Sequence, residues 1–277
     1  MRNIQMFCLS LEPNHYKFIK ELGYIPVGLG QKDFNEEWFS DKKGINISEK
    51  NRNYGEYTYH YWIWKNYLNK LDDKWIGFCQ YRKFWSSKQY RTEEINLDSL
   101  NSQVLREIPK KFEEYESIIG EPIFINQFRA MKFFKKGFRF FVKRPLVLFS
   151  KKKRNLHFHF DFMHGENNLN KAIDLLNDKN QKDFRKFVNN EVSFNPHNMF
   201  ICKSKKILEN YYEDLFPWLE RCEKIFGFEN LKGFGKIRIY TFLAERFMPY
   251  WFRKNTKCAT MPIIFYDIRK DLNHKTL

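Results

Sequence analysis

The sequence lacks most of the short motifs by which an enzyme class is recognised. It contains no GxGxxG, no GxxxxGK[ST], no HExxH and no GxSxG, which argues against a Rossmann dehydrogenase and a P-loop kinase. An Asp-x-Asp pair, the common metal–diphosphate clamp of sugar transferases, is also absent. Any enzymatic chemistry must therefore come from a less familiar arrangement of side chains.

Cysteine and long apolar runs are scarce as well. The five Cys residues lie far apart without CxxC spacing, which fits reduced thiols rather than a disulfide framework. No stretch approaches about 18 uninterrupted apolar residues, and residues 1–8 are too short and too polar for a signal peptide. We therefore expect a cytoplasmic protein that spans no membrane and at most binds peripherally at the inner face of the plasma membrane.

Acidic residues are outnumbered, since 33 Asp and Glu face 49 Lys and Arg, for a net charge of +16. This excess favours an anionic partner, which is a nucleic acid, an anionic lipid surface or a phosphorylated small molecule, although a solvated basic surface needs no partner. Basic side chains concentrate among phenylalanines at residues 128–154. That stretch is compatible with an amphipathic helix, a lipid-binding segment or a base-stacking surface.

Hydrophobic patterns predict an α/β protein. Strands are expected at residues 4–11, 24–30, 75–79, 117–126, 145–149 and 198–202, and helices near 53–71, 167–176, 181–190, 205–226 and 236–252, with 90–116 mostly helical. The first of these helices has capping-box spacing at Asn53 and Glu56. Strands alternate with helices up to about residue 150, and helices dominate from about residue 151. We expect one domain over residues 1–277.

The loop after the strand at residues 75–79 is the best candidate for a ligand site. Ligands of open α/β sheets bind beyond the carboxyl ends of the strands, where Gln80, Tyr81, Arg82 and Lys83 emerge. Arg82 can hold a diphosphate by forked hydrogen bonds, while Tyr81 packs on a ring. A basic surface turn is the alternative interpretation.

A second group of polar side chains lies further along the chain. His157, His159 and Asp161 alternate, so a strand would place them on one face, with His164 just beyond. Such residues can bind a metal, supply an acid–base pair or form a polar wall.

A third group lies on the helix predicted at residues 236–252. Arg238 and Glu245 are seven residues apart, so they share one face of that helix. Either they form a structural salt bridge or they line a cleft.

Residues 46–66 read NISEKNRNYGEYTYHYWIWKN, and this string is distinctive. It closely resembles a segment of a bacterial family catalogued as domain of unknown function 4422, whose members are regarded as glycosyltransferases of capsule, exopolysaccharide and lipopolysaccharide loci. Further similar strings keep the family's order: IPVGLG at 25–30, WIGFCQYRKF at 75–84, GEPI at 120–123, NMFI at 198–201 and FLAER at 242–246. The resemblance extends over residues 4–266.

The resemblance implies a GT-A-like α/β sheet that binds a nucleotide sugar, such as a UDP-sugar, with a helical acceptor-side part after about residue 150. The acceptor is then a lipid-linked precursor of a surface polysaccharide, reached at an anionic membrane surface. The implied donor-binding residues are Lys50, Asn51, Glu56, Gln80, Tyr81, Arg82, Lys83, Glu121, Asn198 and Arg246. Asp161, His164 or Glu245 is the expected catalytic group that deprotonates the acceptor hydroxyl.

We assign no metal ligand from the sequence. Because Asp-x-Asp is missing, we expect basic side chains to neutralise the departing diphosphate, while a role for Mn²⁺ or Mg²⁺ stays open. The chain departs from the family pattern at Gln80, where His is usual, and at Gly55, where Cys is usual. A positioning role for that His is easier to reconcile with Gln, which still hydrogen-bonds a sugar hydroxyl.

Two other functions stay open at this point. A non-catalytic scaffold of a polysaccharide assembly complex would accommodate the substituted Gln80. A nucleic-acid-binding protein would use the charge of +16 and the interleaved aromatic residues, but no recognised nucleic-acid-binding module appears. We therefore expect no nucleic acid among the partners.

Overall fold

The structure is a computed structural model, and it describes residues 4–72, 74–88, 95–127, 147 and 150–269. The chain divides into two compact units, which we describe separately. The sheet unit comprises Met1–Glu121, Asn198–Glu213 and Phe252–Leu277, and the helical unit comprises Pro122–His197 and Asp214–Trp251. Each unit takes residues from both halves of the chain, so the limits of the units do not coincide with a division near residue 150.

The sheet unit contains one mixed β-sheet of nine strands among the described residues. Its strands are β1 Ile4–Ser10, β2 Ile25–Gly28, β3 Phe39–Ser40, β4 Trp75–Gln80, β5 Lys83–Trp85, β6 Ser117–Gly120, β9 Phe200–Cys202, β10 Cys258–Met261 and β11 Ile263–Phe265. The order along the sheet is β10-β6-β9-β4-β1-β2-β3, and β5 pairs with β4 and β11. β1 to β4 run parallel, and β9 is antiparallel to both β4 and β6. The carboxyl ends of β1, β2, β4 and β6 therefore meet at one edge of the sheet.

Short helices surround this sheet within the sheet unit. They are η1 Pro13–His15, α1 Tyr16–Glu21, η2 Ser48–Lys50, α2 Asn51–Tyr54, α3 Tyr57–Trp62, η3 Ile63–Tyr67, η4 Leu68–Lys70, α4 Leu97–Gln103 and η5 Lys110–Phe112. The strands predicted at residues 4–11, 24–30, 75–79 and 198–202 are confirmed as β1, β2, β4 and β9. The prediction of a mostly helical segment at 90–116 is wrong over residues 95–116, where loops separate α4 from η5.

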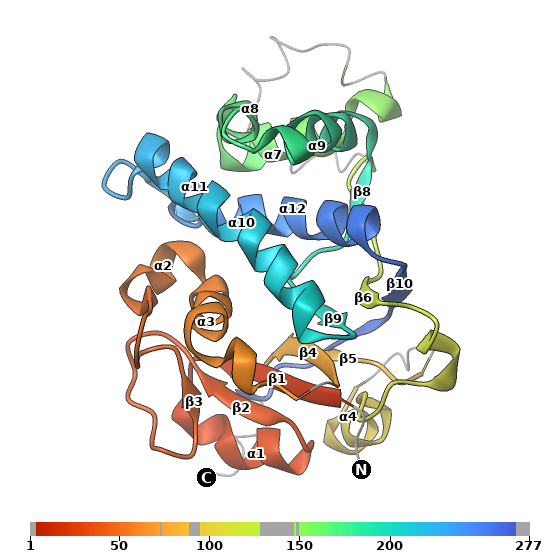
Figure 1. Ribbon diagram of the computed structural model, residues 1–277. Coiled ribbons are helices and arrows are strands. Elements are labelled where there is room, and N and C mark those ends of the chain that lie inside the picture. The colour runs from red at the N-terminus through yellow and green to blue at the C-terminus, as the bar shows by residue number, and fades with distance from the viewer. Residues whose placement is uncertain (1–3, 73, 89–94, 128–146, 148–149, 270–277) are drawn as a thin grey trace. The chain divides into compact units, whose positions relative to one another are not determined.

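Alternation along the strands gives the sheet two apolar faces. On one face, Phe7 of β1 stacks on Phe78 of β4 with ring centroids 5.6 Å apart, and the His60 ring of α3 lies 4.4 Å from the Phe78 ring. On the other face, Met6 joins the core cluster that contains Ile19 of α1. Figure 1 shows α1 and α3 on opposite sides of the sheet. Helices cover both faces because a mainly parallel sheet is apolar on both sides.

The helix predicted near residues 53–71 is divided into shorter pieces. α2 ends at Gly55, whose φ of 55° is a conformation that residues with a side chain rarely adopt. The capping-box prediction is wrong, because Asn53 lies within α2 and the Glu56 side chain makes no capping hydrogen bond. A capping box is formed instead by Asn96 and Ser99 at the start of α4.

The helical unit is built from η6 Lys151–Lys153, α7 Leu156–His164, α8 Asn168–Ile173, α9 Asp178–Asn190 and α11 Phe234–Ile237, with a small sheet of β7 Ile123–Phe124 and β8 Ser193–Phe194. α10 Lys205–Phe226 and α12 Ile239–Asn255 each contain residues of both units. The four helices predicted after residue 166 are thus confirmed. The strand suggested for residues 157–161 is wrong, because they lie in α7.

Two predictions fall on parts of the chain that the structure does not describe. The basic stretch at residues 128–144 lies wholly outside the described residues. The strand predicted at 145–149 lies outside them too, apart from Val147, which is helical. In the described part of the chain, no helix is both long enough and apolar enough to cross a membrane.

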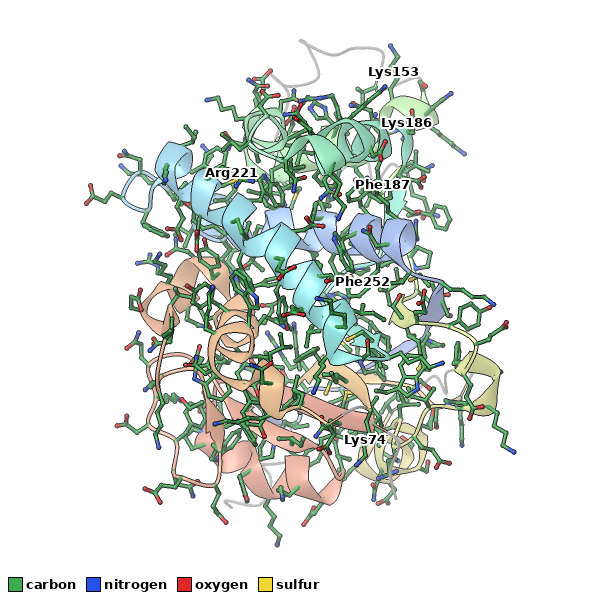
Figure 2. All side chains as sticks on the ribbon, viewed as in Figure 1. Lys74, Lys153, Lys186, Phe187, Arg221 and Phe252 are labelled. Carbon is green, nitrogen blue, oxygen red and sulfur yellow. The ribbon has the colours of Figure 1, made fainter. Side chains whose placement is uncertain are left out.

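Aromatic side chains fill the core of the helical unit. Phe184 of α9 packs against Trp218 of α10 and Phe247 of α12, with ring centroids 6.0 and 5.4 Å away. The indole N–H of Trp218 donates to a carbonyl oxygen of α8, 2.6 Å away, so the one polar group of this buried ring is satisfied. Lysines lie at the surface of this unit, and Figure 2 shows Lys153 and Lys186 projecting from it.

One buried carboxylate in the sheet unit lacks compensation. Asp41 follows β3 and is 0% exposed, and neither of its carboxylate oxygens has a hydrogen-bond partner among the described residues. Burial raises the pKa of the Asp41 carboxyl, because the charged form loses its hydration. Thr58, the Asp41 backbone N–H and the charge of Lys42 all lower this pKa, but by less than burial raises it.

Asp41→Asn is therefore expected to stabilise the protein at neutral pH. The carboxyl of the unfolded chain ionises near pH 4, whereas the folded protein resists ionisation up to its raised pKa. The free energy of unfolding of the wild type should fall as the pH rises through this window, by about 1.4 kcal/mol for each unit of raised pKa. Urea unfolding between pH 4 and 8 should show this loss in the wild type and in the control Asp33→Asn, whose carboxylate is exposed, but not in Asp41→Asn. An Asp41→Asn protein that is less stable than the wild type at pH 7 would contradict this account.

Candidate functional site

The pairing of β4 with β9 brings two predicted site residues together. Ile76 lies opposite Cys202 and Gly77 opposite Ile201, so Asn198, two residues before β9, comes close to Gln80, the last residue of β4. Both residues lie just at the ends of their strands, at the edge where the carboxyl ends of the parallel strands meet. Side chains alternate along a strand, so Gln80 points to the same face as Phe78, which is the face that carries α3.

Glu56, at the start of α3, joins these two amides. The Nε2 group of Gln80 donates to Oε1 of Glu56 at 3.3 Å, and Nδ2 of Asn198 donates to the same oxygen at 2.8 Å. Lys83 donates from Nζ to Oε1 of Gln80 at 3.3 Å, so the Gln80 amide links a cation to a carboxylate. The glutamate and the glutamine are both half-buried. Three predicted donor-site residues thus form one polar cluster, which we call the Glu56 cluster, with Lys83 at its rim.

Buried tyrosines orient the Asn198 side chain. The Tyr57 hydroxyl donates to Oδ1 of Asn198 at 3.1 Å and lies 3.0 Å from the Tyr211 hydroxyl. Burial raises the pKa of Tyr57 well above its usual value, so this phenol stays neutral and keeps its proton. Asn198 is only 3% exposed, so its amide is fixed with the nitrogen toward Glu56.

Tyr81 and Arg82 occupy the turn between β4 and β5. The Tyr81 ring is buried, while Arg82 is exposed with its guanidinium 5.0 Å from that ring. The Arg269 guanidinium lies 5.7 Å from the same ring and donates from Nε to Oδ1 of Asp267 at 2.9 Å. Two arginines thus flank Tyr81 at the carboxyl end of β4. The sequence did not identify Arg269, because this residue belongs to no recognised motif and comes close to Tyr81 only through the pairing of β11 with β5.

The carboxyl end of β1 adds a buried polar pair that sequence reasoning also missed. Ser10 Oγ lies 2.7 Å from Nδ1 of His15, and both residues are buried. Burial lowers the pKa of His15 to about 4, so its imidazole is neutral at physiological pH. The His15 ring lies 5.1 Å from the Tyr81 ring, which connects the ends of β1 and β4.

The remaining predicted residues of the sheet unit lie near this edge but outside the Glu56 cluster. Asn51 donates from Nδ2 to the Gly55 carbonyl oxygen at 2.9 Å and to Oγ1 of Thr58 at 3.1 Å, so its amide ties α2 to α3. Lys50 is half-buried at the end of η2. Glu121 is exposed just beyond the carboxyl end of β6.

Arg246, also predicted to bind the donor, belongs to a separate cluster within the helical unit. It is 2% exposed, and its guanidinium lies 3.8 Å from the Phe194 ring centre. Nη1 of Arg246 lies 2.5 Å from Oε2 of Glu245, whose other oxygen accepts the His197 backbone N–H at 2.7 Å. Burial by itself would raise the pKa of Glu245, but Arg246 and that N–H together lower it. Glu245 is therefore ionised and paired.

The partner of Glu245 is thus Arg246 and not Arg238. The sequence places Arg238 and Glu245 on one helix, but α12 begins at Ile239 and Arg238 ends α11. The prediction of one helix over residues 238–246 is wrong at its first residue.

Two histidines lie beside this ion pair. Burial, together with the charge of Arg246, lowers the pKa of His159 and of His164 to about 3. Nδ1 of His164 lies 2.9 Å from the Gly235 carbonyl oxygen, and its ring stacks on Phe242. Asp161 of the same helix accepts the Asn167 backbone N–H at 3.1 Å. The predicted catalytic residues Glu245 and His164 therefore lie close together; His164 is buried, whereas the Glu245 side chain is 13% exposed and ion-paired.

A family model described as a domain of unknown function, DUF4422, matches residues 11–256 of the chain. The chain belongs to this family. No curated protein matches it. A solved structure described as the apo form of the bifunctional glycosyltransferase WbbM is similar, with a TM-score of 0.70 and 19% sequence identity. The match covers 96% of this chain but 45% of that chain, so this chain spans less than half of the WbbM chain. The likeness shows that this DUF4422 chain has a mixed α/β fold of the GT-A-like kind.

The described residues of this DUF4422 chain offer no evident site for Mn²⁺ or Mg²⁺. No group of three or more His, Cys, Asp or Glu side chains comes together over the parts of the chain that the structure describes. Divalent hard cations need several oxygen ligands from the protein or the substrate. We therefore derive no step through a metal ion.

The Arg246–Glu245 pair is expected to be strongly coupled in folding. Arg246→Met leaves a buried carboxylate without its cation and should lower the free energy of unfolding by about 3–5 kcal/mol. Glu245→Gln should cost a similar amount, because it leaves the guanidinium uncompensated. The double variant should cost clearly less than the sum of the two, by at least about 1 kcal/mol in a double-mutant cycle from urea unfolding. Additive losses would show that the two side chains do not stabilise each other.

Proposed function

We propose that this DUF4422 protein is a glycosyltransferase that moves a sugar from a nucleotide sugar onto a surface-polysaccharide precursor. The Glu56 cluster is the observation that carries this proposal. It sets a carboxylate, held by two amides, at the carboxyl edge of the parallel strands, which is where ligands of open α/β sheets bind. The GT-A-like fold and the structural likeness to a glycosyltransferase support the same function.

Arg82 and Arg269 are the residues that we propose to receive the donor diphosphate. Guanidinium groups bind phosphate oxygens through forked, charge-assisted hydrogen bonds, and two of them flank Tyr81 at the end of β4. Lys83 adds a further cation beside Gln80. The negative charge that develops on the leaving nucleoside diphosphate is then stabilised without a metal ligand from the described residues. A UDP-sugar is the donor that we propose to test first.

Glu56 is the group that we propose to accept the acceptor proton. The acceptor oxygen bonds to the anomeric carbon, the bond from that carbon to the diphosphate oxygen breaks, and the hydroxyl proton passes to the carboxylate. Asp161, His164 and Glu245 are less suited to this step, because Asp161 and His164 are buried in the helical unit and Glu245 is ion-paired with Arg246. An imidazole with a pKa near 3, such as that of His164, is also a weak base at neutral pH.

The acceptor that we propose is a saccharide linked to a lipid diphosphate at an anionic membrane surface. The basic side chains at residues 128–154 would bring the enzyme to that surface, each contributing about 1 kcal/mol near anionic lipid. Of the basic residues in this stretch, Lys151, Lys152 and Lys153 are described and exposed, and Arg154 is described and buried. Glycosyl transfer would then take place at the cytoplasmic face of the membrane.

A non-catalytic scaffold is the second candidate, and Gln80 in place of the usual His is the observation that favours it. In the structure, however, Gln80 donates to Glu56 and accepts from Lys83, which are functions that a positioning His would serve. The substitution therefore leaves the Glu56 carboxylate with its donors, and catalysis remains the better supported candidate.

Arg82→Ala should weaken donor binding without unfolding the protein. Thermal unfolding followed with UDP-, GDP-, CMP- and dTDP-sugars should show that one nucleotide class raises the Tm, as mass action requires of a ligand of the folded state. Losing one charge-assisted contact should weaken that binding about 10- to 100-fold, while the Tm without ligand stays close to that of the wild type. Lys88→Ala, at another exposed cation, serves as the control. If none of the four classes raises the Tm of the wild type, the donor site is not where we place it.

Glu56→Gln should abolish transfer while donor binding persists. Removing a general base slows a reaction by about 10²- to 10⁴-fold, and Gln keeps the size of the side chain. The readout is release of nucleoside diphosphate from the donor that stabilises the protein, together with the Tm shift caused by that donor. Glu107→Gln, at an exposed glutamate of the same unit, should change neither quantity. A Glu56→Gln protein with an unchanged rate would exclude the carboxylate as the proton acceptor.

A further inference from the structure

A hollow lined by aromatic rings lies at the β3 edge of the sheet unit, apart from the Glu56 cluster. It has a volume of about 360 Å³ and is lined in part by Phe34, Trp38, Phe39 and Trp62. This volume is within the range of about 300–1,000 Å³ that is typical of small-molecule sites. Trp62 ends α3, whereas Glu56 is the N-cap of α3, so the two are about 9 Å apart along the helix axis.

The rings of this hollow are held in place before any ligand arrives. The indole N–H of Trp62 donates to the Lys43 carbonyl oxygen at 2.6 Å, and the ring stacks on buried Tyr59 with an interplanar angle of 14°. Phe34 packs edge-on against Trp38 with ring centroids 4.9 Å apart. The Phe34 ring also lies directly over the backbone of Gly28, where any Cβ atom would meet the ring at 2.3 Å. A preorganised set of rings loses little entropy when it binds a ligand.

The charges around the hollow differ from those of the whole chain. Asp33, Glu36 and Glu37 line it together with Lys42 and Lys43, so acidic groups outnumber basic groups here, although the chain carries +16. Lys42 is in addition engaged by the Gln31 and Lys32 carbonyl oxygens at 3.3 and 3.0 Å. Lys42 also pairs with Asp33 at 3.8 Å, so the rim keeps an excess of one negative charge, which disfavours a diphosphate. Its carboxylates accept hydrogen bonds from hydroxyl groups.

We propose that this hollow binds a neutral saccharide ring, namely a sugar unit of the acceptor that is removed from the reacting hydroxyl. Sugar rings present C–H groups on one face, which pack on aromatic rings, and hydroxyl groups around the edge, which donate to carboxylates. Half-buried Phe34, Phe39 and Trp62 supply the apolar contact, and the acidic rim supplies the acceptors. The choice of a saccharide rests on the proposed glycosyl transfer, whereas the charge of the rim argues against a nucleotide.

The test is direct binding of uncharged tetrasaccharides of glucose, galactose, mannose, rhamnose and N-acetylglucosamine to the full chain. Tryptophan fluorescence and calorimetry should show saturable binding of at least one of them without any donor present. Trp62→Ala should weaken that binding by at least about tenfold, since it removes the largest half-buried ring of the lining. Trp64→Phe, at a half-buried tryptophan two residues further along the chain, should leave the affinity unchanged.

A second variant guards against a loss of folding in Trp62→Ala. Glu36→Ala combined with Glu37→Ala changes only exposed rim residues and should also weaken binding by at least about tenfold while the Tm is kept. Absence of saturable binding, or binding that survives both variants, overturns the proposal. A Trp62→Ala protein that loses the Tm shift with nucleotide sugars would overturn it as well, by assigning the hollow to the donor. Absence of saccharide binding alone would leave the donor prediction for Arg82 standing, and an Arg82→Ala protein that keeps donor binding would leave the saccharide prediction standing.

Discussion

The hydrogen bonds that converge on one oxygen of Glu56 are the interaction on which the rest of the sheet unit's site depends. A half-buried carboxylate must be compensated by donors, because burial of an unpaired charge is costly. Here the donors come from residues 24 and 142 positions away along the chain, so they exist only when β4 and β9 have paired. The site therefore depends on the assembled sheet, and the residues just before the antiparallel strand β9 supply the second amide.

Periodicity and strand-end reasoning predicted a large part of this unit from the sequence. Compact apolar runs marked β1, β2 and β4, and the rule that ligands bind beyond the carboxyl ends of strands pointed to Gln80 and Arg82. The sequence did not predict that the helical segment after residue 50 is divided into shorter helices. Its apolar spacing is continuous, but Gly55 adopts a positive φ and divides it, and composition does not reveal a backbone angle.

The histidine-rich segment shows that an alternating sequence pattern can predict the wrong secondary structure. Apolar and polar residues alternate at positions 156–161, which is typical of a strand. The structure has a helix there, and its cap provides the reason: Oδ1 of Asn155 accepts the Phe158 backbone N–H at 2.9 Å. An N-cap residue satisfies an N–H that a first helical turn leaves without a partner, so one asparagine outweighs the alternation that follows it. Local sequence signals do not predict contacts such as that between Arg269 and Tyr81, because these contacts depend on the pairing of β11 with β5.

Gln80 connects Lys83 to Glu56 through an amide that does not titrate. A neutral imidazole at this place would offer one donor and one acceptor, and the Gln80 amide offers the same pattern, since it donates to Glu56 and accepts from Lys83. The two side chains differ in that imidazole titrates between about pH 5 and 8, whereas an amide does not. The Gln80 amide therefore joins the Lys83 side chain to the Glu56 side chain, and this amide stays uncharged between about pH 5 and 8. The Gln80 amide thus contacts Glu56 without titrating in this range, which is the behaviour expected of a residue whose task is to hold the carboxylate in place.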